Sequence, residues 1–362
     1  MAKQDELQEL LSELYSIDKE LYLIKGVAAL LSWDKTVNLP PKAFSQRADQ
    51  EALINVQAHE LFTSKRVTAL VNQLSQKKFY DKLSGIDKAK IDIYNWRLKK
   101  LLKVPKSHVE EYITATSIAH HAWEDARNKE SFKILVPQLK KIFELKKLEA
   151  KYIDPKAHPY NIFLDDYERG MSMDELDKLF VELKKELLEI LSKIKSSPNY
   201  KRINGRKIAS MGDFPKDAQW ELSYDMANRI VGDKDRLVIS KSTHPFMTSI
   251  SADDQRITTG VRNDPMFSFG STVHESGHAL YESNFDPKIC GTILASDGAL
   301  SLGMHESQSR FWENMICQSE SFWKGYYPVF QSKFPALKKL PVKEFYESVN
   351  IAEPSLVRIE SD

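Results

Sequence analysis

Apolar residues recur three and four positions apart along the start of the chain, and this spacing constrains its fold most strongly. Between Gln4 and Lys25 the apolar positions are Leu7, Leu10, Leu11, Leu14, Ile17, Leu21 and Ile24. They follow the period of one helix face. The same period predicts helices at 46–62, 86–102, 106–128, 132–152, 173–196 and 216–231. The first 230 residues are therefore predicted to be nearly all α-helical.

The pattern of residue types changes after Gly232. Residues 248–261 are rich in β-branched side chains with a polar turn between them, which predicts a β-hairpin. Helical periodicity returns at 267–281 and again at about 299–322. The sequence therefore predicts a mainly α fold with a small sheet.

No internal repeat or low-complexity linker divides the chain. We therefore expect a single domain over residues 1–362. Its helical N-terminal part would cover residues 1–232, and the part that carries the candidate site would cover residues 233–362.

The charged residues argue against two classes of partner. The chain has 52 Lys and Arg residues against 51 Asp and Glu residues, so no whole-chain field would attract nucleic acid or an anionic membrane. Its N-terminal sequence does not resemble a secretion signal, and its apolar runs fall far short of the roughly 20 residues that span a bilayer. Two cysteines, Cys290 and Cys317, are too few for a disulfide framework. We therefore predict a cytoplasmic protein without nucleic-acid or membrane partners.

The segment His274-Glu275-Ser276-Gly277-His278 lies inside a predicted helix. A spacing of four residues puts both imidazoles on one helix face, within reach of one metal ion. Glu275 is adjacent to the first histidine, where its carboxylate can take a proton from a water that zinc activates. The sequence therefore predicts a zinc peptidase site with His274 and His278 as ligands and Glu275 as the general base. Cobalt also suits such donors.

A catalytic zinc site needs a third protein ligand, and the sequence offers several candidates. His305 and Glu306 lie on the next predicted helix, whereas Asp286 and Asp297 lie in the loop before it. The spacing of these residues leaves all four candidates open.

Two segments upstream are candidates for binding a peptide. His244-Pro245-Phe246 precedes the predicted hairpin, and Asp254 and Arg256 lie within it. Considered alone, an ordinary loop histidine and a hairpin charge pair are the simpler interpretations. In the functional interpretation, an extended peptide pairs with an exposed strand edge, and nearby polar groups hold its terminus.

Taken together, these segments resemble the thermostable, Taq-type metallocarboxypeptidase family. Its successive signatures are matched, in order and approximate spacing, by His244-Pro245-Phe246, Asp254-x-Arg256-x-Thr258, His274-Glu275-x-x-His278 and His305-Glu306-Ser307-Gln308. Further similarity in the first half covers Trp33-Asp34, Pro40, Arg47, Trp123, Arg127 and residues 164–171. The resemblance extends over nearly the whole chain.

The resemblance implies a large helical zincin-type fold with a small sheet beside a deep, narrow active-site channel. It also implies a homodimer that removes single C-terminal residues from peptide substrates with broad specificity. The family uses the Glu of its His-Glu-Ser-Gln segment as third zinc ligand, which here is Glu306. His305 then becomes a neighbour that orients a ligand or touches substrate.

Recognition of a free C-terminus is expected to rest on an arginine, because a planar guanidinium offers a carboxylate two hydrogen bonds. Arg256 in the hairpin and Arg358 in the family's arginine-containing signature are the candidates, and the sequence does not show which of them faces the metal. The residues expected to bind substrate are therefore His244, Asp254, Arg256, His305 and Arg358.

The sequence departs from the family pattern at its C-terminus. Residues 357–362 match the next family signature, and the chain ends there, without the family's later Gln-Asp-x-His-Trp signature. We therefore expect a missing C-terminal lobe, and a chain that binds zinc but turns over peptides more slowly than longer members. The competing interpretations are a helical zinc oligopeptidase or endopeptidase, and a catalytically weak zinc-binding fragment.

Overall fold

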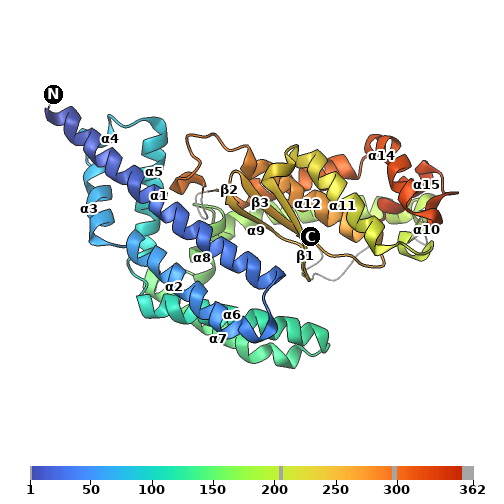
Figure 1. Ribbon diagram of the computed structural model, residues 1–362, viewed down its shortest axis with the longest axis horizontal. Coiled ribbons are helices and arrows are strands. Elements are labelled where there is room, and N and C mark those ends of the chain that lie inside the picture. Colours follow the sequence, from blue (N-terminus) through green and yellow to red (C-terminus); the bar gives the residue numbers. More distant parts are fainter. Residues whose placement is uncertain (1, 204–206, 296–299, 353–362) are drawn as a thin grey trace. The chain divides into compact units, whose positions relative to one another are not determined.

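The computed structural model describes residues 2–203, 207–295 and 300–352 (Figure 1). Its architecture is mainly α-helical with a small β-sheet, which confirms the predicted fold class. Among the described residues, none of the helices is both long enough and apolar enough to cross a bilayer.

Contacts between Cα atoms divide the chain into two compact units. Unit 1 comprises Met1–Met171 and Phe285–Ser301, and unit 2 comprises Ser172–Asn284 and Leu302–Asp362. The organisation into one domain over residues 1–362 stays a prediction.

Unit 1 is built from helices, and those predicted from periodicity in this part of the chain are present. They are α1 (Ala2–Val37), α2 (Phe44–Phe62), α3 (Lys65–Leu74), α4 (Lys77–Tyr80), α5 (Gly85–Leu101), α6 (Lys106–Asn128), α7 (Val136–Ile153) and α8 (Pro159–Tyr167). Helix α7 begins at Val136 and not at residue 132, because Pro137 suits the first turn of a helix but not its interior.

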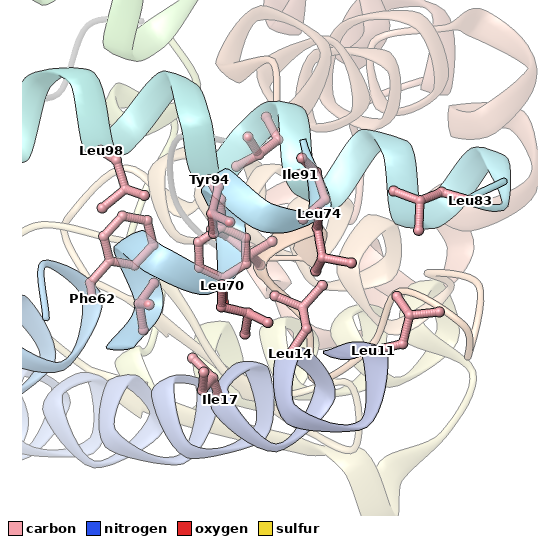
Figure 2. Close-up of a cluster of buried hydrophobic side chains, with 14 of the residues drawn as sticks. Leu11, Leu14, Ile17, Phe62, Leu70, Leu74, Leu83, Ile91, Tyr94 and Leu98 are labelled. Carbon is pink, nitrogen blue, oxygen red and sulfur yellow. The ribbon is translucent and has the colours of Figure 1, made fainter. Parts of the chain in front are cut away.

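The core of unit 1 contains the periodic leucine face of α1. Leu14 and Ile17 are fully buried in one cluster with Leu70 of α3 and Tyr94 of α5 (Figure 2). The ring of Phe62 stacks on Tyr94 with centroids 5.1 Å apart. Burial of each such side chain stabilises the fold by roughly 1.5–3 kcal/mol, so this face holds α1, α3 and α5 together.

Unit 2 combines helices with three strands in its described part. Its elements are α9 (Met173–Ser196), α10 (Pro198–Ile203), α11 (Lys216–Val231), β1 (Leu237–Lys241), β2 (Met247–Ser251), β3 (Asp254–Thr259), α12 (Pro265–Ser283), α13 (Leu302–Arg310), α14 (Glu320–Lys333) and α15 (Val342–Val349). In Figure 1 the strands lie beside α11 and α12, and the contacts between these elements agree.

The sheet has the strand order β1-β3-β2. Strands β2 and β3 pair antiparallel, with Thr248 opposite Arg256, which confirms the predicted hairpin. Strand β1 pairs parallel to β3 and was not predicted. Because β3 is central, its residues Ile257 and Thr258 are fully buried, and the strand gives α12 a firm surface to pack on.

The helix predicted at about 299–322 is interrupted. Helix α13 ends at Arg310, a π-helical stretch runs through Phe311–Cys317, and α14 starts separately at Glu320. Ser319 caps α14 by accepting a hydrogen bond from the backbone N–H of Phe322 at 3.1 Å. A π-helical insertion is often found at functional sites, and this one follows directly on α13, the helix that carries the predicted third ligand Glu306.

Candidate active site

Helix α12 carries the two predicted histidine ligands in its buried middle. It begins after Asp264, whose side chain accepts a hydrogen bond from the backbone N–H of Met266 at 2.9 Å, and Pro265 occupies its first turn. His274 and His278 follow one turn apart on one face, with ring centroids 5.0 Å apart. The local structure therefore presents both imidazoles in one direction.

Glu306 of α13 meets both imidazoles. Its Oε2 lies 3.6 Å from Nε2 of His274 and 3.3 Å from Nε2 of His278. The three residues offer ligand atoms that all lie within 4.8 Å of one another. Donors at zinc distances on the corners of a tetrahedron are roughly 3.3–3.6 Å apart, so the two distances from Glu306 to the histidines suit a zinc ion.

Gly277 lets α12 and α13 approach closely. A Cβ atom at this position would lie 2.8 Å from Cα of Ser309 and 3.0 Å from the backbone oxygen of Gln308. Backbone atoms cannot turn aside as a flexible side chain can, so a larger residue would push the two helices apart. The buried hydroxyl of Ser309 also donates to the backbone oxygen of Glu306 at 2.7 Å. Gly277 therefore sets the distance at which Glu306 faces the histidines.

The surroundings of the three residues set their protonation. Burial alone lowers the pKa of His274, but a 2.9 Å contact between its Nδ1 and Oε2 of Glu313, with the neighbouring carboxylates, raises it overall. Burial lowers the pKa of His278 and outweighs the effect of Glu306. Burial raises the pKa of Glu306, yet its contacts with His278 and His274 lower it to about 2. Glu306 is therefore ionised at neutral pH, as a metal ligand must be.

The two histidines line a cavity of about 470 Å³. Glu275 lines the same cavity and is only 7% exposed. This volume is typical of sites that bind small molecules or short peptide segments. The cavity is therefore lined by both imidazoles and by the buried carboxylate of Glu275, a group that can exchange a proton with a bound molecule.

The predicted peptide-binding segments are joined around Thr258. The backbone N–H of Thr258 donates to the carbonyl of Phe246 at 2.9 Å, and its hydroxyl accepts from the N–H of Phe246 at 2.9 Å. The hydroxyl of Ser242 lies 2.6 Å from that of Thr258 and 2.5 Å from the carbonyl oxygen of His244. These contacts hold His244 at the wall of the cavity, which it lines.

Asp254 and Arg256 form a two-pronged ion pair on β3. Nε and Nη2 of Arg256 each lie 2.8 Å from an oxygen of Asp254, and this hydrogen bonding raises the pKa of Arg256. The described lining of the cavity includes neither residue. Arg358, the other candidate for binding a substrate carboxylate, lies outside the described residues.

His305 lies beside His278 and does not belong to the three-residue set. The two rings stack with centroids 4.5 Å apart, and Nε2 of His305 is 2.9 Å from Oε1 of Glu282. His305 also lines the cavity. Of the other candidates for third ligand, Asp286 accepts a hydrogen bond from the backbone N–H of Lys288 at 2.9 Å, and Asp297 lies outside the described residues.

Two residues at the site were not predicted from the sequence. Glu313 contacts Nδ1 of His274, and Arg310 contacts Oε1 of Glu306 at 3.0 Å. Arg310 and Glu313 follow Glu306 by four and seven residues, which places all three on one side of a helix. That spacing is visible in the sequence and could have identified them once Glu306 was chosen.

Similarities to known proteins extend over nearly the whole chain. Residues 13–362 match the model of the family described as carboxypeptidase Taq (M32) metallopeptidase. "Carboxypeptidase 1" of Bacillus subtilis is 32% identical over 359 residues, covering 97% of this chain and 70% of that protein. The M32 carboxypeptidase of Deinococcus radiodurans R1 superposes with a TM-score of 0.82 at 29% identity, covering 98% of this chain and 70% of the other. The expectation of slower turnover than in longer relatives stays a prediction.

Proposed function

We propose that this chain, which belongs to the carboxypeptidase Taq (M32) family of metallopeptidases, is a zinc-dependent carboxypeptidase. The observation that carries the proposal is the grouping of His274, His278 and Glu306, whose ligand atoms all lie within 4.8 Å of one another, beside a cavity that both histidines and Glu275 line.

His274, His278 and Glu306 would hold the metal through two nitrogens and one carboxylate oxygen. Three protein ligands leave a fourth position open, which distinguishes a catalytic zinc site from a structural one. Zinc supplies Lewis acidity when it is bound, which makes water a better nucleophile at neutral pH and polarises a carbonyl. Cobalt suits the same donors.

Glu275 would act as the general base. Its carboxylate takes a proton from the attacking water and then passes that proton to the nitrogen of the departing amino acid. Burial among protein groups keeps bulk water from competing for the carboxylate, which is 7% exposed. The role therefore follows from its place in the cavity and not from ligation.

The peptide would lie along β2, which is an edge strand of the described sheet. One side of β2 pairs with β3, and its other side would offer backbone hydrogen bonds to a peptide. His244 and His305 line the cavity and would contact the end of the substrate. Arg256 or Arg358 would bind its terminal carboxylate. For Arg256 this requires a guanidinium that already pairs with Asp254 to turn partly towards substrate.

The family resemblance supports two finer proposals, a homodimer in solution and broad specificity for the terminal residue. A third proposal, a cytoplasmic location without nucleic-acid or membrane partners, comes from the sequence composition. The near balance of 52 basic and 51 acidic residues supports the absence of a polyanionic partner.

A free C-terminal carboxylate should be essential for cleavage. The zinc-loaded protein is expected to remove one residue from a short peptide, and to cleave the C-terminally amidated form at least about 100-fold more slowly, because the amide leaves the carboxylate-binding arginine without its ionic partner. Mass spectrometry of the products measures both rates. The matched control is the N-acetylated peptide, which keeps its carboxylate and should be cleaved like the parent.

Equal cleavage of the free and amidated peptides would replace this proposal with an oligopeptidase or endopeptidase. Zinc binding without cleavage of either peptide would instead indicate a catalytically weak zinc-binding fragment.

A further inference from the structure

Four charged or polar groups form a closed ring of contacts behind the proposed metal ligands. Nε2 of His274 lies 3.6 Å from Oε2 of Glu306, and Oε1 of Glu306 lies 3.0 Å from Nε of Arg310. Nη1 of Arg310 lies 3.4 Å from Oε2 of Glu313, and that same oxygen lies 2.9 Å from Nδ1 of His274. One guanidinium therefore touches both carboxylates that face the imidazole.

We propose that Arg310 is a positioning residue that holds a metal ligand, Glu306, and the partner of a second ligand, Glu313, in fixed orientation. The inference rests on the proposed function, since it takes His274 and Glu306 to be ligands. Arg310 itself would touch neither the metal nor the substrate, and its effect would pass through the two carboxylates.

The two carboxylate oxygens of Glu306 have different partners, which supports this role. Oε2 faces both histidines, whereas Oε1 is taken by Arg310. A carboxylate oxygen that already accepts a hydrogen bond from a guanidinium is the poorer metal donor, so Arg310 would favour Oε2 as the ligand atom. Glu313 uses a single oxygen to contact both His274 and Arg310, which fixes the direction of the imidazole.

The helix geometry allows Arg310 to bridge the carboxylates of Glu306 and Glu313. Glu306 and Arg310 are four residues apart on α13, and Glu313 follows in the π-helical stretch Phe311–Cys317. Arg310 and Glu313 are 30% and 23% exposed at the side chain, so the ring is partly shielded from solvent. A rigid guanidinium fork can bridge two carboxylates that a single ammonium group reaches less well.

Charge and positioning predict opposite effects when Arg310 is removed. A positive charge close to a cation site repels the metal, so charge alone predicts that Arg310→Gln binds zinc more tightly. Loss of positioning predicts weaker binding, by about 10- to 100-fold, as for other groups that orient metal ligands. Arg310→Lys keeps the charge but not the fork, and so should also bind zinc more weakly if positioning dominates.

The experiment measures zinc affinity by competition with a chromogenic chelator for the wild-type chain, Arg310→Gln and Arg310→Lys. The visible absorption spectrum of the cobalt-loaded proteins reports the ligand geometry independently of activity. The matched control is Arg229→Gln on α11, since Arg229 also pairs with a carboxylate four residues earlier, Asp225, with Nε and Oδ2 2.7 Å apart. We expect weaker zinc binding and an altered cobalt spectrum in both Arg310 variants, and neither change in the control.

The Arg310 substitutions are also made in the Glu313→Gln protein, so that a general loss of stability can be distinguished from loss of the contact between Arg310 and Glu313. In Glu313→Gln, substitution of Arg310 should weaken zinc binding less than it does in the wild type, because one end of the bridge is already lost. Equal effects in the two backgrounds would overturn the bridge. Unchanged or tighter zinc binding by Arg310→Gln, with an unchanged cobalt spectrum, would overturn the positioning role. A wild-type chain that binds no zinc would instead contradict the proposed function.

Discussion

Glu275→Gln is expected to lower kcat by about 100- to 10,000-fold while the protein still binds one zinc per chain. The substitution preserves the shape of the side chain but removes the carboxylate that accepts the proton. Because Glu275 lines the cavity and stands outside the His274, His278 and Glu306 set, metal binding should not depend on it. Peptide hydrolysis and elemental analysis of the same preparation measure the two quantities.

The matched control is Glu320→Gln on α14. Glu320 is an exposed residue whose Oε1 pairs with Nζ of Lys324 at 2.9 Å, so this variant makes the same chemical change outside the site. It should keep both zinc and turnover. Near wild-type turnover by a zinc-loaded Glu275→Gln protein would remove Glu275 from the mechanism.

His278→Ala is expected to weaken zinc binding by at least about 100-fold, because it removes one of three proposed protein ligands, and in structural zinc sites roughly 10–16 kcal/mol of binding free energy is shared among only four ligands. The remaining pair, His274 and Glu306, cannot replace the missing nitrogen. Chelator competition measures the affinity, and elemental analysis after dialysis measures the zinc that stays bound.

His305→Ala provides the control for this prediction. Its imidazole stacks on that of His278 at 4.5 Å and lines the same cavity, yet it lies outside the ligand set. It should therefore keep stoichiometric zinc. If His305→Ala lost zinc and His278→Ala retained it, the two histidines would have to exchange roles.

Local patterns predicted most of the helices, because a helix face repeats every three to four residues whatever its partner. The same logic placed His274 and His278 on one face of α12. It failed where structure depends on partners distant in sequence. Strand β1 is five residues long and pairs parallel to β3, and the break between α13 and α14 depends on a π-helical stretch that has no apolar signature.

The candidate site shows the same limit. Spacing alone leaves Glu306, His305 and two aspartates open as third ligand, and the resemblance to a family singles out Glu306. The position of Glu306 depends on the contact of Gly277 with Ser309, which joins two helices and leaves no periodic trace. The spacing of Arg310 and Glu313 from Glu306 is visible in the sequence, but the contact of Glu313 with His274 depends on the packing of α12 against the π-helical stretch.

The position of the metal tests the account most directly. Crystals of the zinc-loaded chain, measured on both sides of the zinc absorption edge, locate the ion by its anomalous scattering. We predict one peak per chain, within about 2.0–2.2 Å of Nε2 of His274, Nε2 of His278 and a carboxylate oxygen of Glu306. A peak coordinated by His305, or one away from α12, would contradict the proposed site.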